Sequence, residues 1–157
     1  PYSLIDTGIE NEHFIFQFIE FNDGQNDYSI KMGGVTGQFG ITYESKELNC
    51  HFQCDITVGN VHDFYISLKN AYDTLGDNSV AILKNYGNIL KRTQLVIEFD
   101  NKGHCSIDGS FLNKENLYKS GVCFSFEIDQ THILDALNSM QTFFKELERI
   151  QGHNEFY

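Results

Sequence analysis

The sequence predicts an α+β fold: an antiparallel sheet of about eight strands with two amphipathic helices packed on it, in the order ββββα-ββββα. Apolar residues at every second position dominate most of the chain, and this alternation gives way twice to the i, i+3, i+4, i+7 spacing of a helix. Hydrophobic residues make up 41% of the 157 positions, which is enough for a core without disulfides. We therefore expect residues 1–157 to form a single domain.

Four period-2 runs predict the strands of the first half: His13–Phe21, Tyr28–Met32, Thr36–Glu44 and Cys50–Val58. The first run is apolar in both phases, which is typical of a strand covered on both sides or of one whose outer face meets a partner. Helical spacing follows, with Asn60 as the predicted N-cap and Gly76 as the residue after the helix. The apolar stripe of this helix contains Val61, Phe64, Tyr65, Leu68, Tyr72 and Leu75.

The second half repeats this plan. Its predicted strands are Ser79–Lys84, Thr93–Asp100, Cys105–Phe111 and Val122–Ile128. The sequence Asn101-Lys102-Gly103 predicts a hairpin loop between the middle two. The last helix is expected from Gln130 to Ile150, with an apolar stripe of Ile133, Leu137, Met140, Phe144 and Leu147.

The two strand–helix segments resemble each other. Residues 52–75 and 124–147 align without a gap at an offset of 72, with identical Phe52/Phe124 and Ile56/Ile128 pairs and an acidic Asp55/Glu127 pair. Such a match is typical of an internal duplication. Any strand followed by an amphipathic helix also aligns by phase alone, and the upstream segments align poorly, so both explanations stay open.

Charge restricts the kind of partner. The chain has 22 acidic and 11 basic residues, a net charge of −11, so it repels phosphate backbones and favours a basic protein partner over nucleic acid. The excess acid is equally compatible with a role in solubility alone. Since no apolar run approaches the ~18 residues of a membrane span, we expect no membrane association.

Cysteine usage predicts the compartment. Cys50, Cys54, Cys105 and Cys123 form no C-x-x-C pair, and Cys54 and Cys105 sit at apolar-phase strand positions. Burial as free thiols is therefore expected for these two, which indicates a reducing, cytoplasmic environment.

No pattern points to catalysis, a metal or a cofactor. The six histidines form no H-E-x-x-H or H-x-H motif, and we expect them to be structural or surface residues. The glycine-rich stretch Gly33–Phe39 lies between strands and opens no helix, so a turn or bulge is favoured over a phosphate-binding loop. We therefore predict a protein that is not an enzyme and holds no cofactor or metal.

The strand alternation does predict an acidic surface. If the helices cover the apolar phase of the sheet, the other phase is open to solvent or to a partner. Acidic residues recur on that open phase, and together they would form a band along one face or rim of the sheet: Asp55, Glu98, Asp100, Asp108, Glu127 and Asp129. An ordinary solvated polar face is the alternative explanation.

Three segments occur in a recognisable order: Asn26–Ser45 with its G-G-x-x-G-x-F pattern, the hairpin Ile97–Phe111 ending in Asp-Gly, and Phe124–Leu147, where F-E-I-D-Q-T leads into the last helix. In this order, in a small acidic protein, they resemble the WapI family of bacterial immunity proteins. In that comparison the shared glycines fit turns, Phe39 and Phe126 fit a core, and Asp129 fits a helix cap.

The resemblance implies a cytoplasmic antitoxin that binds the C-terminal domain of a secreted polymorphic toxin, expected to be a nuclease, and catalyses no reaction itself. It supplies no contact residues. From charge and phase we expect the toxin-binding residues to include Asp55, Glu98, Asp100, Asp108 and Glu127, facing a basic toxin domain. The rival surface is the aromatic segment Phe14–Tyr28. The alternative function is a small-molecule-binding or regulatory module formed between two related halves.

Overall fold

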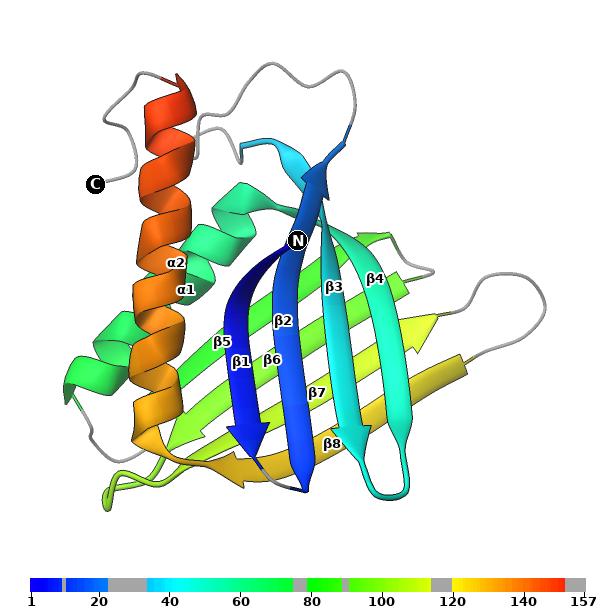
Figure 1. Cartoon of the computed structure of the whole chain (residues 1–157), viewed down its shortest axis with the longest axis vertical. Coiled ribbons are helices and arrows are strands. Elements are labelled where there is room, and N and C mark those ends of the chain that lie inside the picture. The colour runs from blue at the N-terminus through cyan, green and yellow to red at the C-terminus, as the bar shows by residue number, and fades with distance from the viewer. Residues whose placement is uncertain (10, 23–33, 75–78, 89–90, 114–119, 152–157) are drawn as a thin grey trace.

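Strand pairing in the computed structural model divides the eight strands into two antiparallel sheets (Figure 1). The structure describes residues 1–9, 11–22, 34–74, 79–88, 91–113 and 120–151. The first sheet has the order β1 (Tyr2–Ile9), β2 (Glu12–Phe21), β3 (Thr36–Ser45) and β4 (Asn49–Thr57). The second has the order β5 (Ser79–Asn88), β6 (Lys91–Phe99), β7 (Cys105–Asn113) and β8 (Ser120–Ile128). Helix α1 (Val58–Thr74) follows β4 and α2 (Gln130–Gln151) follows β8, which confirms the predicted order.

The two sheets pack face to face, with the first in front of the second and their strands crossing obliquely in Figure 1. Aromatic rings bridge the sheets: Tyr43 of β3 stacks on Phe124 of β8 with ring centroids 4.4 Å apart, and Phe52 of β4 lies 5.4 Å from Phe111 of β7. The apolar phase of each sheet is thus buried by the other sheet, as in a β-sandwich. The predicted α+β class, with eight antiparallel strands and two helices, is confirmed, and the structure adds that the strands are divided between two sheets.

The helices lie together along one side of the sandwich, next to β1 and β5 (Figure 1). Each contacts the first strand of the opposite half: α1 packs on β5 and α2 packs on β1. The ring of Phe144 on α2 lies 5.6 Å from that of Tyr65 on α1, and Phe143 lies 5.1 Å from Phe18 of β2. This reciprocal arrangement gives the two halves the same layout.

Several element boundaries differ from expectation. The strand β1 was not predicted, whereas the predicted strand Tyr28–Met32 lies outside the described residues. Helix α1 begins two residues before Asn60, because the Oγ1 of Thr57 accepts a hydrogen bond from the Asn60 backbone N–H at 3.3 Å and so acts as the N-cap. For α2 the expected cap is confirmed: Asp129 Oδ1 accepts from the Thr131 backbone N–H at 2.8 Å.

None of the four cysteines forms a disulfide, and Cys54 and Cys105 are buried as predicted. Cys123 is exposed on β8 and Cys50 is half-buried on β4. Burial, reinforced by the nearby carboxylates of Asp129 and Asp100, raises the pKa of the Cys105 thiol to about 12. Because the thiolate is the reactive form, burial and pKa both protect Cys105 from modification.

We expect iodoacetamide at pH 8 to alkylate Cys123 first, and to reach Cys54 and Cys105 only when the protein is unfolded in urea. Mass spectrometry of peptides taken over a time course measures each rate. Equal rates at Cys123 and Cys105 in the native protein would mean that the β6–β7 hairpin opens readily, contrary to its packing here.

Candidate functional site

The outward face of the second sheet carries most of the predicted acidic residues. Strand register aligns its outward side chains into rows that run across β5, β6, β7 and β8, and two neighbouring rows carry the acids. The first row is Val80, Glu98, Ser106 and Glu127, and the second is Ile82, Val96, Asp108 and Ser125. The alternation predicted from the sequence therefore places Glu98, Asp108 and Glu127 on one surface.

These three carboxylates are not paired with a basic residue in the described ranges. Glu98 and Glu127 are exposed and Asp108 is half-buried, and none of them forms an ion pair or side-chain hydrogen bond with any other residue that the structure describes. Since adjacent strands are about 4.8 Å apart, Glu98 and Glu127 lie roughly 10 Å from each other across the sheet. The basic residues on this face, Lys84 and Arg92, are exposed and lie beyond these two rows.

Asp100 lies at the end of β6 and organises the following turn. Its Oδ1 accepts hydrogen bonds from the backbone N–H groups of Lys102 and His104, both at 2.8 Å, and its Oδ2 lies 2.9 Å from Nδ1 of His104. Desolvation acts to raise the pKa of Asp100, but these hydrogen bonds together lower it below its ordinary value. Gly103, with φ of 83°, completes the predicted hairpin loop. Asp100 thus adds negative charge to this face and also has a structural role.

Two open hollows lie among these acids. One, of about 320 Å³ at the β6–β7 turn, is lined in part by Glu98, Asp100, His104 and Glu127. The other, of about 430 Å³, lies over β6, β7 and β8, where Val96 and Asp108 contribute to its lining. The surface is therefore shaped to admit side chains of a partner at positions bordered by carboxylates.

Asp55 is separated from the other predicted residues. It is exposed on β4, in the first sheet, and the outward faces of the two sheets of a sandwich point in opposite directions. The expectation that all five acids share one face is wrong for Asp55. The repeat explains the error, since the offset of 72 makes Asp55 the counterpart of Glu127 in the other half.

The rival aromatic surface is mostly interior. Phe14 and Phe16 are fully buried between the sheets, and Phe18 packs against the core, while Ile15 and Ile19 remain half-buried on the outward face. The part of this segment from Asp23 to Tyr28 lies outside the described residues. Of the two alternating sets of apolar residues in this segment, the set that contains Phe14 and Phe16 therefore belongs to the core.

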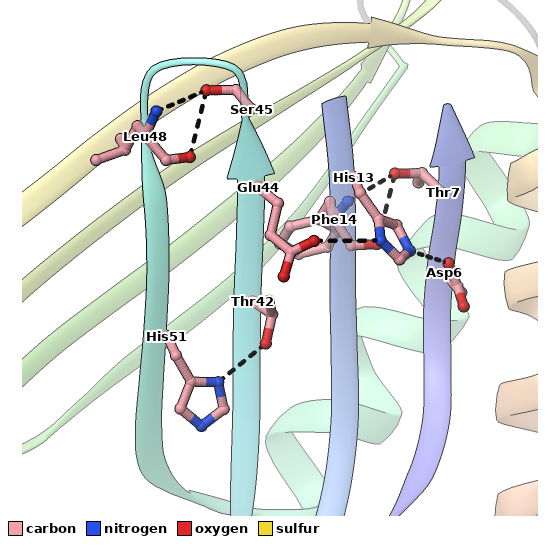
Figure 2. A network of polar contacts seen from close by, with 9 residues as sticks. All are labelled: Asp6, Thr7, His13, Phe14, Thr42, Glu44, Ser45, Leu48 and His51. Carbon is pink, nitrogen blue, oxygen red and sulfur yellow. Dashed lines mark hydrogen bonds and ion pairs between the residues drawn. The ribbon is translucent and has the colours of Figure 1, made fainter. Parts of the chain in front are cut away.

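The outward face of the first sheet has a different electrostatic character (Figure 2). Nε2 of His13 lies 2.6 Å from Oδ1 of Asp6, and its Nδ1 lies 3.9 Å from Oε2 of Glu44. Nearby, Nδ1 of His51 lies 2.9 Å from the Thr42 hydroxyl. Asp6 and Glu44 are thus each paired with an imidazole, as Asp100 is in the second sheet, whereas Glu98, Asp108 and Glu127 form no ion pair with any described residue. Across the described ranges, no group of three or more His, Cys, Asp or Glu residues is arranged to hold a metal ion.

With this geometry established, the chain was compared with families of known proteins and with curated proteins. Neither comparison gave a match. In the described part of the chain, neither α1 nor α2 combines the length and apolar character needed to cross a membrane.

The sequence prediction missed two residues of this surface. Val80 and Ile82 on β5 are 37% and 40% exposed and lie in the same rows as the acids. The sequence pattern that could have indicated them is the run Val80-Ala81-Ile82-Leu83, which places apolar residues on both faces of the strand.

Proposed function

We propose that this protein is a cytoplasmic immunity protein that binds and neutralises the C-terminal toxin domain of a secreted polymorphic toxin. The observation that carries the proposal is the pair of outward rows on the second sheet, where Glu98, Asp108 and Glu127 form no ion pair with any cationic residue that the structure describes. The order of segments that resembles the WapI family points to the same function.

A basic nuclease domain fits this surface. Nucleases hold phosphate groups in basic clefts, so a carboxylate-rich protein face can occupy such a cleft or lie beside it. Long-range attraction raises the association rate, and close packing at the centre of the interface sets the dissociation rate. Neutralisation by this route requires binding alone, with no covalent step and no cofactor.

The alternative of a small-molecule module between the two halves receives less support. The region between the sheets is filled by aromatic rings, including the Tyr43–Phe124 and Phe52–Phe111 pairs. The hollows described above are open and lie on the surface. This packing favours an outer binding surface over an internal ligand cavity.

The test is a triple charge reversal, Glu98→Lys, Asp108→Lys and Glu127→Lys, which leaves Asp100 in place to hold the turn. The proposal expects a large secreted protein to be encoded beside this gene, and the C-terminal domain of that protein, in catalytically inactive form, serves as the toxin domain in the test. We expect the association rate at low salt to fall at least ~10-fold, because the attraction that steers the encounter becomes repulsion.

A matched control reverses three exposed acids on the helices, Asp63→Lys, Asp73→Lys and Asp135→Lys, and changes the net charge equally. If both triple variants slow association to the same extent, the effect is one of net charge and the second-sheet surface is wrong. Absence of binding by the parent protein to the neighbouring toxin domain would overturn the proposed function itself.

A further inference from the structure

We infer that the partner is anchored by an apolar contact at Val80 and Ile82, beside the acids, and that its contact surface carries an apolar cluster flanked by Lys or Arg. This inference rests on the proposed function and specifies the chemistry of the partner. We call Val80, Ile82 and Val96 together the apolar strip.

The apolar strip is continuous with the acidic rows. Val80 pairs with Glu98 across β5 and β6, and Ile82 pairs with Val96, which in turn pairs with Asp108 on β7. Directly paired residues in an antiparallel sheet have Cβ atoms about 5 Å apart, so the apolar and acidic side chains belong to a single patch. One partner surface can therefore contact both at once.

The core does not explain why β5 is apolar on its outward side. Its inward residues Ala81 and Leu83 are 0% and 1% exposed and belong to the core. Val80 and Ile82 point the other way, away from the opposite sheet. Apolar side chains in the outward phase of an edge strand favour unwanted strand association, so natural sheets more often carry charges there. Burial by a specific partner accounts for their presence.

The flanking charges select among possible occupants. A second copy of this chain would bring Glu98, Asp108 and Glu127 against an equally acidic face or against a protein of net charge −11. Phosphates of nucleic acid and anionic lipid headgroups are repelled in the same way. A protein surface with Lys or Arg around an apolar centre satisfies both parts of the patch, in the usual pattern of an apolar core within a polar rim.

The test separates anchoring from steering. The double variant Val80→Ser, Ile82→Ser is measured against the inactive toxin domain described above by surface plasmon resonance at two salt concentrations. We expect the dissociation rate to rise ~10-fold or more, while the association rate and its salt dependence stay close to those of the parent. The charge-reversal variant is expected to show the converse pattern.

Leu48→Ser is the matched control, because Leu48 is 39% exposed in the β3–β4 turn of the first sheet, and it should bind like the parent. If the parent binds the toxin domain and the double variant dissociates at the parental rate, the apolar anchor is wrong while the proposed function stands. If the parent sediments as a dimer that the double variant abolishes, the occupant is a second copy and the inference is overturned.

Discussion

Replacing Phe144 by alanine is expected to lower the free energy of unfolding by about 3–5 kcal/mol. Phe144 is fully buried on α2, where its ring lies edge-on to His62 at 4.9 Å and near Tyr65 on α1. Truncation therefore removes the side chain that joins the two helices and leaves a cavity between them. Urea denaturation followed by circular dichroism measures the loss.

Leu134→Ala provides the control on the same helix, because Leu134 is 44% exposed and its loss should change stability by no more than ~0.5 kcal/mol. A Phe144→Ala protein whose urea midpoint matches the parent would show that the interface between the helices contributes little to the fold.

Leu68→Ala on α1, where Leu68 is fully buried, should lower the free energy of unfolding by about 2–5 kcal/mol, because it also leaves a cavity in the core.

Replacing Gly109 by valine is expected to cost about 3 kcal/mol, because no room exists for a side chain at this point of β7. Gly109 pairs with Phe124 on β8, whose ring covers it: a Cβ built on Gly109 would lie 2.6 Å from Cε1 and 2.8 Å from Cε2 of that ring. Phe124 cannot move freely, since its other face stacks on Tyr43 at an interplanar angle of 3°. The insertion therefore disturbs the packing between the sheets.

The matched control is Gly8→Val on β1, where a Cβ would meet no atom within 4 Å. It should leave stability nearly unchanged, within ~0.5 kcal/mol. Adding Phe124→Leu to the Gly109→Val protein should recover part of the loss, because the smaller side chain makes room. If Gly109→Val and Gly8→Val have equal thermal midpoints, the Phe124 ring is not held in the position described.

Local alternation was sufficient to predict most elements, but not how the strands are grouped. The runs with apolar residues at every second position predicted strands β2 to β8, apart from shifts at some strand ends. The change to helical spacing predicted both helices. The strand β1 was missed because its register slips between Ser3 and Ile5, so Leu4 and Ile5 are adjacent and both buried, which breaks the alternation. The division into two sheets depends on which strands pair over long distances, and no single strand encodes that.

The same limit explains the result at the candidate site. The alternation of inward and outward residues correctly predicted that Glu98, Asp108 and Glu127 share one surface, because their strands are neighbours in one sheet. It could not separate Asp55, which has the same local pattern on a strand of the other sheet. Nor could it distinguish outward Val80 and Ile82 from core residues, since the adjacent Ala81 and Leu83 are also apolar.

The reciprocal position of the helices also has a consequence for the order of folding. The strand β1 is made well before α2, the helix that packs on it, and the Tyr2 hydroxyl donates to the Ser139 carbonyl across 137 positions of sequence at 3.1 Å. Likewise α1 cannot bury its apolar stripe on β5 until that strand has left the ribosome. Such distant pairings slow folding and leave apolar surface exposed in the nascent chain. Newly made protein should therefore depend on chaperones until both halves have been translated.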